Sequence, residues 1–345
     1  MTTGMRLVGL LASMLMLRAL TQVPAYPSPV VPQHWPIRPS WTSGYLPAPD
    51  DGPIGSYSGY ANAGTDGKNT YAPNRYHQAY RPSALVFCAN PPFCLPKRLV
   101  VFIPGHTFQP SDYTAFLETA RDAGFYVIGL DYPNPHAASS ICNTTTCYAD
   151  FREKVIFADG PFNGGGVDID SHPQDAVIKR LKAILLYLKA HDPYGAWGDY
   201  LVDDTTAEDG VRPAFGNIIF ADHSGYASFI ASKKQVARVV MLAFVVDSTG
   251  TKQSPVSAQW IDSSNPTPSS RYFGMVNTND NFDGSSPAEQ NHYLRITHNW
   301  DTLNVPPANR TLVTDACIGA LPCHMIVAQQ PCHTPDWRAL LGPVY

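Results

Sequence analysis

The sequence predicts an α/β fold in which a mostly parallel central sheet is covered by helices on both faces. Short, continuously apolar runs at 99–103, 125–130 and 218–221 are typical of strands that are buried on both sides. Segments with helical spacing of apolar residues lie between them, and such connections join parallel strands. The 345 residues are enough to bury a large core.

The composition predicts a globular protein that recognises neither nucleic acid nor an anionic membrane. Hydrophobic residues make up 44% of the chain, and the mean hydropathy is -0.16. The formal net charge of -4 gives no electrostatic attraction to either polyanion. Charged residues amount to only 15%, while the chain holds 32 prolines and 25 glycines, so much of it is expected to be loop.

Residues 1–25 are predicted to be a signal peptide for secretion. Arg6 precedes the apolar run Leu7–Leu17, and Val23-Pro24-Ala25 supplies small residues where a signal peptidase cleaves. Arg18 puts a charge at the end of the apolar run, and a poorly packed N-terminal helix is the alternative. No later stretch is apolar over the length needed to span a bilayer.

The cysteines agree with an oxidising compartment. Six of the seven fall in close pairs, which are Cys88 with Cys94, Cys142 with Cys147, and Cys317 with Cys323. Such spacing is typical of local disulfides, although Cys332 could replace one partner of the last pair, and reduced buried thiols are the alternative. In a secreted chain, Asn143-Thr144-Thr145 and Asn309-Arg310-Thr311 are acceptor triplets for glycosylation.

An N-terminal arm is expected to precede the first strand–helix–strand unit of the sheet. Residues 26–82 are predicted to be an N-terminal arm, since they are rich in Pro, Tyr, Ser and Gly and lack periodicity. The domain is predicted to span 83–345. Its first unit is the strand at 99–103, a helix between Ser111 and Gly124, and the strand at 125–130.

Residues 133–170 are predicted to be a long polar insertion whose glycine run is a plain loop. Within it, Asn163-Gly164-Gly165-Gly166 lacks the Lys-Ser/Thr of a phosphate-binding loop. Asp168, Asp170 and His172 are bunched as in a solvated turn, with a metal site as the alternative. The sequence therefore predicts no cofactor and no metal.

The rest of the chain is predicted to continue the sheet. A long amphipathic helix begins at Pro173, and an acidic loop follows it near Trp197. Beyond the strand at 218–221 we expect, in order, a helix at 226–231, strands at 237–247 and 271–276, a helix opened by the capping box Ser286–Glu289, and a strand at 311–313.

Three residues at strand ends predict nucleophilic catalysis. Ser224 stands between a strand and a helix, as in the nucleophile elbow G-x-S-x-G. Asp280 follows a later strand, and His324 lies in a cysteine-framed loop after the last one. The carboxyl ends of parallel strands share one edge, so Ser224 as nucleophile, Asp280 as orienting acid and His324 as base could meet there.

The oxyanion hole and the alternatives follow from the same geometry. The Gly225 amide comes directly after the serine, and His106 or Thr107 after the first strand could supply a second amide. Other residues compete for each role: Ser224 could simply cap a helix, Asp247 rivals Asp280, and His298 and His333 rival His324.

Several of these segments resemble a little-characterised group of α/β-hydrolase-like proteins found in bacteria, plants and fungi. The resemblance covers about residues 85 to 345. It is carried by Cys94-Leu95-Pro96 with the strand 99–105, Gly124-Phe125, Ile128–Asn134, Arg180-Leu181, the Trp197 loop, His223-Ser224 and Val236–Met241. It implies the α/β-hydrolase fold and leaves the substrate open.

The elbow departs from the pattern of that group, which resembles Gly-His-Ser-x-Gly. Asp222 replaces the first glycine, Tyr226 takes the last position, and about three residues after the serine are absent. A nucleophile serine is held in strained backbone that small neighbours permit. Two hypotheses follow: a secreted serine hydrolase acting on a small-molecule ester, or a catalytically impaired relative that binds a ligand or partner.

Overall fold

The computed structural model describes one part of the chain in detail. The described residues are 47–48, 52–53, 77–82, 98–132, 134, 136–160, 162, 176–192, 195–207, 210–243, 245, 247–251, 254–263, 265–277, 311–314 and 323–343. The predicted signal peptide, Asp168, Asp170 and His172, the capping box at 286–289, and Asn309 lie outside them.

Seven described strands form the central sheet. They are β3 (Gln78–Tyr80), β4 (Leu99–Ile103), β5 (Tyr126–Gly129), β8 (Ile218–Asp222), β9 (Arg238–Leu242), β12 (Tyr272–Asn277) and β13 (Thr311–Thr314). Their order in the sheet is β13-β12-β9-β8-β4-β5-β3, and every neighbouring pair is parallel except β3 with β5. The strands expected from the apolar runs are confirmed, within a few residues at their ends.

The antiparallel edge strand comes from the segment predicted to be an arm. Ala79 of β3 pairs with Ile128 of β5, and Ala79 and Tyr80 are buried. The sheet therefore begins before residue 83, the predicted start of the domain. A three-residue strand is too short to show periodicity, so its neighbour β5 determines its conformation.

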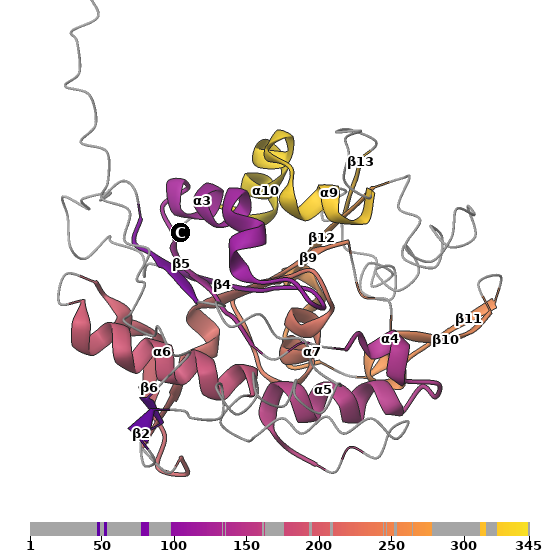
Figure 1. Ribbon diagram of the computed structural model, residues 1–345, viewed down its shortest axis with the longest axis horizontal. Helices are drawn as coiled ribbons and strands as arrows, with labels where there is room; N and C mark the ends of the chain where they lie inside the picture. The colour runs from indigo at the N-terminus through magenta and orange to yellow at the C-terminus, as the bar shows by residue number, and fades with distance from the viewer. Residues whose placement is uncertain are drawn as a thin grey trace, which may run out of the picture. The chain divides into compact units, whose positions relative to one another are not determined.

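Helices cover both faces of the sheet (Figure 1). One face carries α3 (Thr114–Asp122), α9 (Cys323–Gln329) and α10 (Thr334–Leu341), and the other carries α5 (Cys147–Phe157), α6 (Val177–His191) and α7 (Tyr226–Lys233). Alternate residues of β4 divide between two cores: Leu99, Val101 and Ile103 face α5, α6 and α7, whereas Val100 and Phe102 face α3 and α10. The predicted α/β fold is confirmed.

The polar insertion predicted at 133–170 contains two helices that the sequence analysis did not predict, and its glycine run lies outside the described residues. The two helices are α4 (Ala138–Ile141) and α5, and α5 buries Tyr148, Phe151, Val155 and Ile156 against the sheet. These residues recur at helical spacing, but the charged residues between them lower the apolar character of the segment. A disulfide joins Cys142 to Cys147 at the start of α5, as the sequence predicts.

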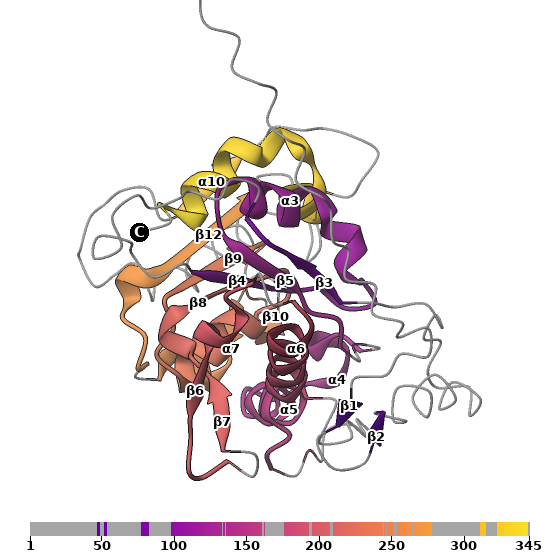
Figure 2. The same ribbon diagram turned by 90° about the vertical axis from the view of Figure 1, so that its left-hand side faces the viewer.

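Among the described residues, three two-stranded hairpins lie outside the central sheet. They are β1 (Pro47–Ala48) with β2 (Gly52–Pro53), β6 (Leu201–Asp203) with β7 (Val211–Pro213), and β10 (Ser248–Thr251) with β11 (Ser254–Ser257). The β6–β7 hairpin extends downward in Figure 2, and β7 contacts α6. The strand predicted at 237–247 ends at Leu242, because the chain turns there through Ala243, whose φ is +62°.

Short 3-10 helices fill several connections. They are η3 (Pro110–Tyr113), η5 (Trp197–Tyr200), η6 (Phe215–Asn217), η7 (Gln259–Asp262), η8 (Ser269–Arg271) and η9 (Pro331–His333). Cys332, in η9, is disulfide-bonded, although the three close cysteine pairs of the sequence would leave it without a partner. Within the described part of the chain, no helix has the length and apolar character needed to cross a membrane.

Candidate active site

Ser224 lies at the carboxyl end of the central strand β8, in the turn that leads into α7. Ser224 is not among the described residues with positive φ; the left-handed conformation in this turn belongs to Gly225, which adopts it without strain. Gly225 has a φ of +82°, whereas the described non-glycine residues with positive φ are Thr107, Ala158 and Ala243. A Cβ on Gly225 would lie 2.8 Å from Arg152 Nη2, so the turn requires glycine here for both backbone and space.

The Ser224 hydroxyl does not cap the helix. Ser224 Oγ is buried and makes no hydrogen bond to any described residue. The start of α7 is instead bound by Asp222, whose Oδ2 accepts a hydrogen bond of 3.1 Å from the Ala227 amide. Ser224 is therefore not the residue whose side chain caps α7, because Asp222 accepts the hydrogen bond from the helix amide.

Asp222 is a buried carboxyl group in an unusual position. Its side chain is nearly inaccessible, and its Oδ1 makes no hydrogen bond within the described residues. Burial raises the pKa of Asp222 to about 6, although the amide of Ala227 and the charge of Arg152 act in the opposite direction. At neutral pH a carboxylate therefore lies two residues from the candidate nucleophile.

Arg152 and Asp247 form an ion pair beneath the elbow. Arg152 Nε donates to Asp247 Oδ2 at 2.5 Å, and Arg152 Nη2 donates to Asp247 Oδ1 at 2.5 Å and to the Ser224 carbonyl at 2.7 Å. Trp260 Nε1 also donates to Asp247 Oδ2, at 2.9 Å. Both oxygens of Asp247, the rival of Asp280, are thus engaged by Arg152.

Sequence reasoning missed Arg152 because it lies in the segment interpreted as a polar insertion. The signal was that Arg152 stands at helical spacing from Tyr148 and Val155, which are apolar. A fully buried arginine needs a carboxylate partner, and Asp247 at the end of an apolar run was the natural one.

The ring of Tyr226 fits into the elbow without displacing the helix. It packs edge-on against Tyr132, with ring centroids 5.2 Å apart, and the Arg152 guanidinium lies 4.8 Å from its centroid. Tyr132 in turn donates to the carbonyl of Pro104 at 2.9 Å. The residue that replaces a glycine of the elbow pattern therefore links α7 to the loop after β4.

The loop after β4 lies next to the elbow and holds the other oxyanion candidates. The Tyr113 hydroxyl accepts from the Gly105 amide at 3.3 Å and lies 3.3 Å from His223 Nδ1. The Thr107 amide donates to the Asn134 carbonyl at 3.0 Å, so that N–H is engaged within the fold. His106 is exposed, and its amide stays the candidate on this loop.

The acid and histidine candidates come after the later strands of the sheet in chain order. Asp280 lies three residues beyond β12, outside the described residues, as does His298. His324 follows β13 but belongs to α9, so the prediction of a loop around it is wrong; Cys323 begins the helix there. α9 packs against β12, the strand that leads to Asp280.

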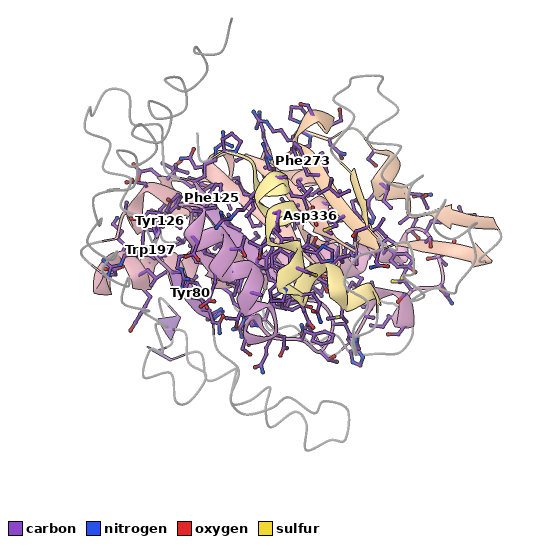
Figure 3. The ribbon with its side chains drawn as sticks, turned by 90° about the horizontal axis from the view of Figure 1, so that it is seen from above. Tyr80, Phe125, Tyr126, Trp197, Phe273 and Asp336 are labelled. Carbon is purple, nitrogen blue, oxygen red and sulfur yellow. A yellow bond between two sulfur atoms is a disulfide. The ribbon has the colours of Figure 1, made fainter. Side chains whose placement is uncertain are left out.

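His333 has a partner of its own. Its Nδ1 lies 2.9 Å from Asp336 Oδ2, at the start of α10, and its buried Nε2 makes no hydrogen bond within the described residues. Figure 3 shows Asp336 on the C-terminal helices that cover the sheet. This contact with Asp336 accounts for the buried position of His333, so no catalytic role at the elbow is needed to explain it.

The strand order decides the architecture. Ser224 follows β8, at the centre of a parallel sheet whose one antiparallel strand is β3, and the segments holding Asp280 and His324 follow β12 and β13. A strand-to-helix turn that places a serine at the carboxyl edge of a mostly parallel sheet, with helices on both faces, is the arrangement of the α/β-hydrolase fold. The chain has the α/β-hydrolase fold.

Comparisons with solved structures return proteins with this α/β-hydrolase fold at low similarity. The esterase Est2 from Thermogutta terrifontis is 11% identical, with 77% of this chain and 84% of that chain covered and a TM-score of 0.35. A putative carboxylesterase from Lactobacillus plantarum is 12% identical, with 70% and 83% covered and a TM-score of 0.36. MenH from S. aureus is 8% identical, with 77% and 97% covered and a TM-score of 0.37.

Two other comparisons give no match. No protein-family model matches this chain. No curated protein matches it either. Among the described residues, no group of three or more His, Cys, Asp or Glu side chains is arranged to hold a metal ion.

Proposed function

We propose that the chain is a serine hydrolase that cleaves small carboxylic esters through an acyl-enzyme on Ser224. The observation that carries the proposal is the Ser224 hydroxyl, which is buried at the carboxyl end of β8 and makes no hydrogen bond within the described residues. Buried hydroxyls are nearly always paired in folded proteins, so an unpaired one at this edge of the sheet calls for a functional explanation.

The roles follow from the strand ends. Ser224 Oγ attacks the ester carbonyl while His324 takes its proton, and Asp280 orients the imidazole. The alcohol leaves with that proton, and water then releases the acid from the acyl-serine. The amides of Gly225 and His106 stabilise the oxyanion, since the Thr107 amide is engaged by Asn134.

A fluorophosphonate probe tests this mechanism, because it labels only an activated serine. We expect labelling of the purified protein that Ser224→Ala abolishes, while Ser228→Ala leaves it unchanged. Ser228 is the matched control, since it lies in α7 with its hydroxyl donating to the Gly225 carbonyl at 2.9 Å. A folded protein that stays unlabelled would exclude the hydrolase proposal.

One observation favours the second candidate, a hydrolase-fold protein that binds without catalysing. The Asp222 carboxylate already occupies the amide end of α7, and a charged oxyanion formed next to it would be repelled. In that case a panel of esters would bind without turnover, and Asp222→Gly would restore labelling by the fluorophosphonate.

We further propose that the chain is secreted and glycosylated. The predicted cleavage after Ala25, the Cys142–Cys147 disulfide and the exposed Asn143 support this. Protein recovered from the medium of a eukaryotic host should begin at Tyr26 and lose mass after enzymatic removal of N-linked glycans. Recovery only inside the cell, with residues 1–25 retained, would contradict secretion.

A further inference from the structure

A cavity of about 690 Å³ lies at the edge of the sheet opposite Ser224. It is lined by Asp204, Arg212, Phe215, Gly216, Lys234, Gln235 and Arg271. These residues come from the β6–β7 hairpin and from the chain just before β8, β9 and β12, so they gather where those parallel strands begin. Since β8 has five residues, about 17 Å of strand separates this cavity from the elbow.

The cavity carries more positive charge than its own acid can neutralise. Three of its side chains are cationic and one is anionic, and that one, Asp204, lies 3.3 Å from Arg212. Asp204 also accepts hydrogen bonds from the Thr206 amide and hydroxyl. Within the described residues, neither Lys234 nor Arg271 forms an ion pair with a carboxylate.

Within the described residues, the side chains of Lys234 and Arg271 contact neutral groups. Arg271 Nη1 donates to the Val236 carbonyl at 2.8 Å, which fixes one edge of its guanidinium. The Lys234 ammonium lies 5.9 Å from the ring centroid of Phe157. A carbonyl and an aromatic ring orient these groups but do not neutralise them.

Two further arginines add to the positive charge around Arg271. Arg98 stands before β4 and Arg238 begins β9. Burial and then the charge of Arg271 lower the pKa of Arg98, while burial and then the charge of Arg98 lower that of Arg238 to about 10. Arg238 also lies 4.1 Å from the ring centroid of Phe273, which Figure 3 labels.

We propose that this cavity binds a small organic phosphate monoester. The remaining N–H groups of the Arg271 guanidinium and the Lys234 ammonium would donate to the phosphate oxygens, since an arginine fork matches two of them and lysine adds a point charge. Phe215 supplies an apolar wall, and the volume is that of an ordinary ligand site. A dianion would also relieve the repulsion among the arginines.

Calorimetric titration of the intact protein with phenyl phosphate at pH 7.5 tests the proposal. Phenyl sulfate and benzoate are the comparison ligands, because each has the same ring but a single negative charge. We expect saturable binding of phenyl phosphate, about tenfold or more tighter than that of either monoanion, and weaker as salt rises. Equal affinity for all three would overturn the proposal.

Two variants locate the binding. Lys234→Gln removes an exposed cation, and Arg271→Lys keeps the charge but loses the planar fork; each should weaken binding about fivefold or more. The matched controls, Lys189→Gln and Arg338→Lys, are exposed and lie outside the cavity, and should bind as the wild type does. If the controls weaken binding equally, the attraction is nonspecific and the proposal fails.

One last variant separates this cavity from the elbow. Ser224→Ala should bind phenyl phosphate with unchanged affinity, because the proposed site does not depend on the proposed esterase. Loss of binding in Ser224→Ala would place the phosphate at the elbow and overturn the inference. Should Arg271→Lys fail to fold, the binding affinity of Lys234→Gln tests the proposal by itself, since within the described residues the Lys234 side chain makes no hydrogen bond to the backbone.

Discussion

Arg152 and Asp247 form a buried ion pair whose guanidinium also holds the carbonyl of Ser224. The pair joins α5 to the chain beyond β9 and fixes the backbone of the elbow from beneath. Trp260 donates to the same carboxylate, and the Arg152 guanidinium lies near the rings of Trp260 and Tyr226. The helix that was hardest to predict therefore supports the candidate nucleophile.

Breaking this pair should destabilise the fold strongly. Arg152→Met leaves the Asp247 carboxylate buried without its cation, and the free energy of unfolding should fall by about 3–5 kcal/mol. The double variant Arg152→Met with Asp247→Leu should recover part of the loss. Lys233→Met is the control, because its ion pair with Glu153 is partly exposed and contributes at most about 1 kcal/mol. Urea unfolding measures all three; a double variant no more stable than the single would refute this account.

Gly225→Ala should cost more than its backbone conformation alone explains. Its Cβ would meet Arg152 Nη2 at 2.8 Å and Val245 Cγ1 at 3.1 Å, in addition to the positive φ. Gly210→Ala is the matched control, because Gly210 has a φ of +72° and no atom within 4 Å of an added Cβ. We expect a loss of about 1–2 kcal/mol for Gly210→Ala and at least about 1 kcal/mol more for Gly225→Ala. Equal losses in thermal unfolding would mean that the elbow has room to relax.

Asp222 should make stability depend on pH. Burial raises its pKa to about 6 from the usual value of 3.8, so the folded protein binds this proton more tightly than the unfolded chain does. The stabilisation that this tighter proton binding gives to the folded state is therefore fully present below about pH 4 and is lost as pH rises to about 6. Relative to Asp222→Asn, the wild type should lose about 3 kcal/mol between pH 4 and pH 7. Urea unfolding across this range checks the sign, and a constant difference would show that Asp222 keeps its ordinary pKa.

Tyr113→Phe should impair the loop beside the elbow. It removes the hydroxyl that accepts from the Gly105 amide and contacts His223, leaving a buried N–H unpaired at a cost of about 1–2 kcal/mol. Tyr200→Phe is the control, because the buried Tyr200 hydroxyl makes no hydrogen bond within the described residues. If the esterase proposal holds, Tyr113→Phe should lower kcat more than it changes KM. Identical stability and kinetics for the two variants would contradict this role for Tyr113.

The parallel core was readable from the sequence because its strands are buried on both faces. The runs 99–103 and 218–222 contain no polar residue apart from Asp222 at the end of the second. Their composition alone therefore predicts buried strands. Ser224 was found for the same reason, since the abrupt end of an apolar strand fixes where its hydroxyl lies. β3 was missed because it is a strand only through its pairing with β5. α5 was missed because its buried Arg152 is compensated only by Asp247, which is distant in the sequence.

The sequence by itself determined the α/β architecture and the placement of Ser224 at the carboxyl edge of β8, since hydrophobic periodicity is a local property. Only the tertiary structure decided what surrounds that serine. Asp222 accepts a hydrogen bond from a helix amide, Gly225 adopts the left-handed conformation of the turn, and Arg152 pairs with Asp247. The physical reason is that burial, charge pairing and steric fit arise between segments far apart in the chain, and no local pattern encodes which partners will meet.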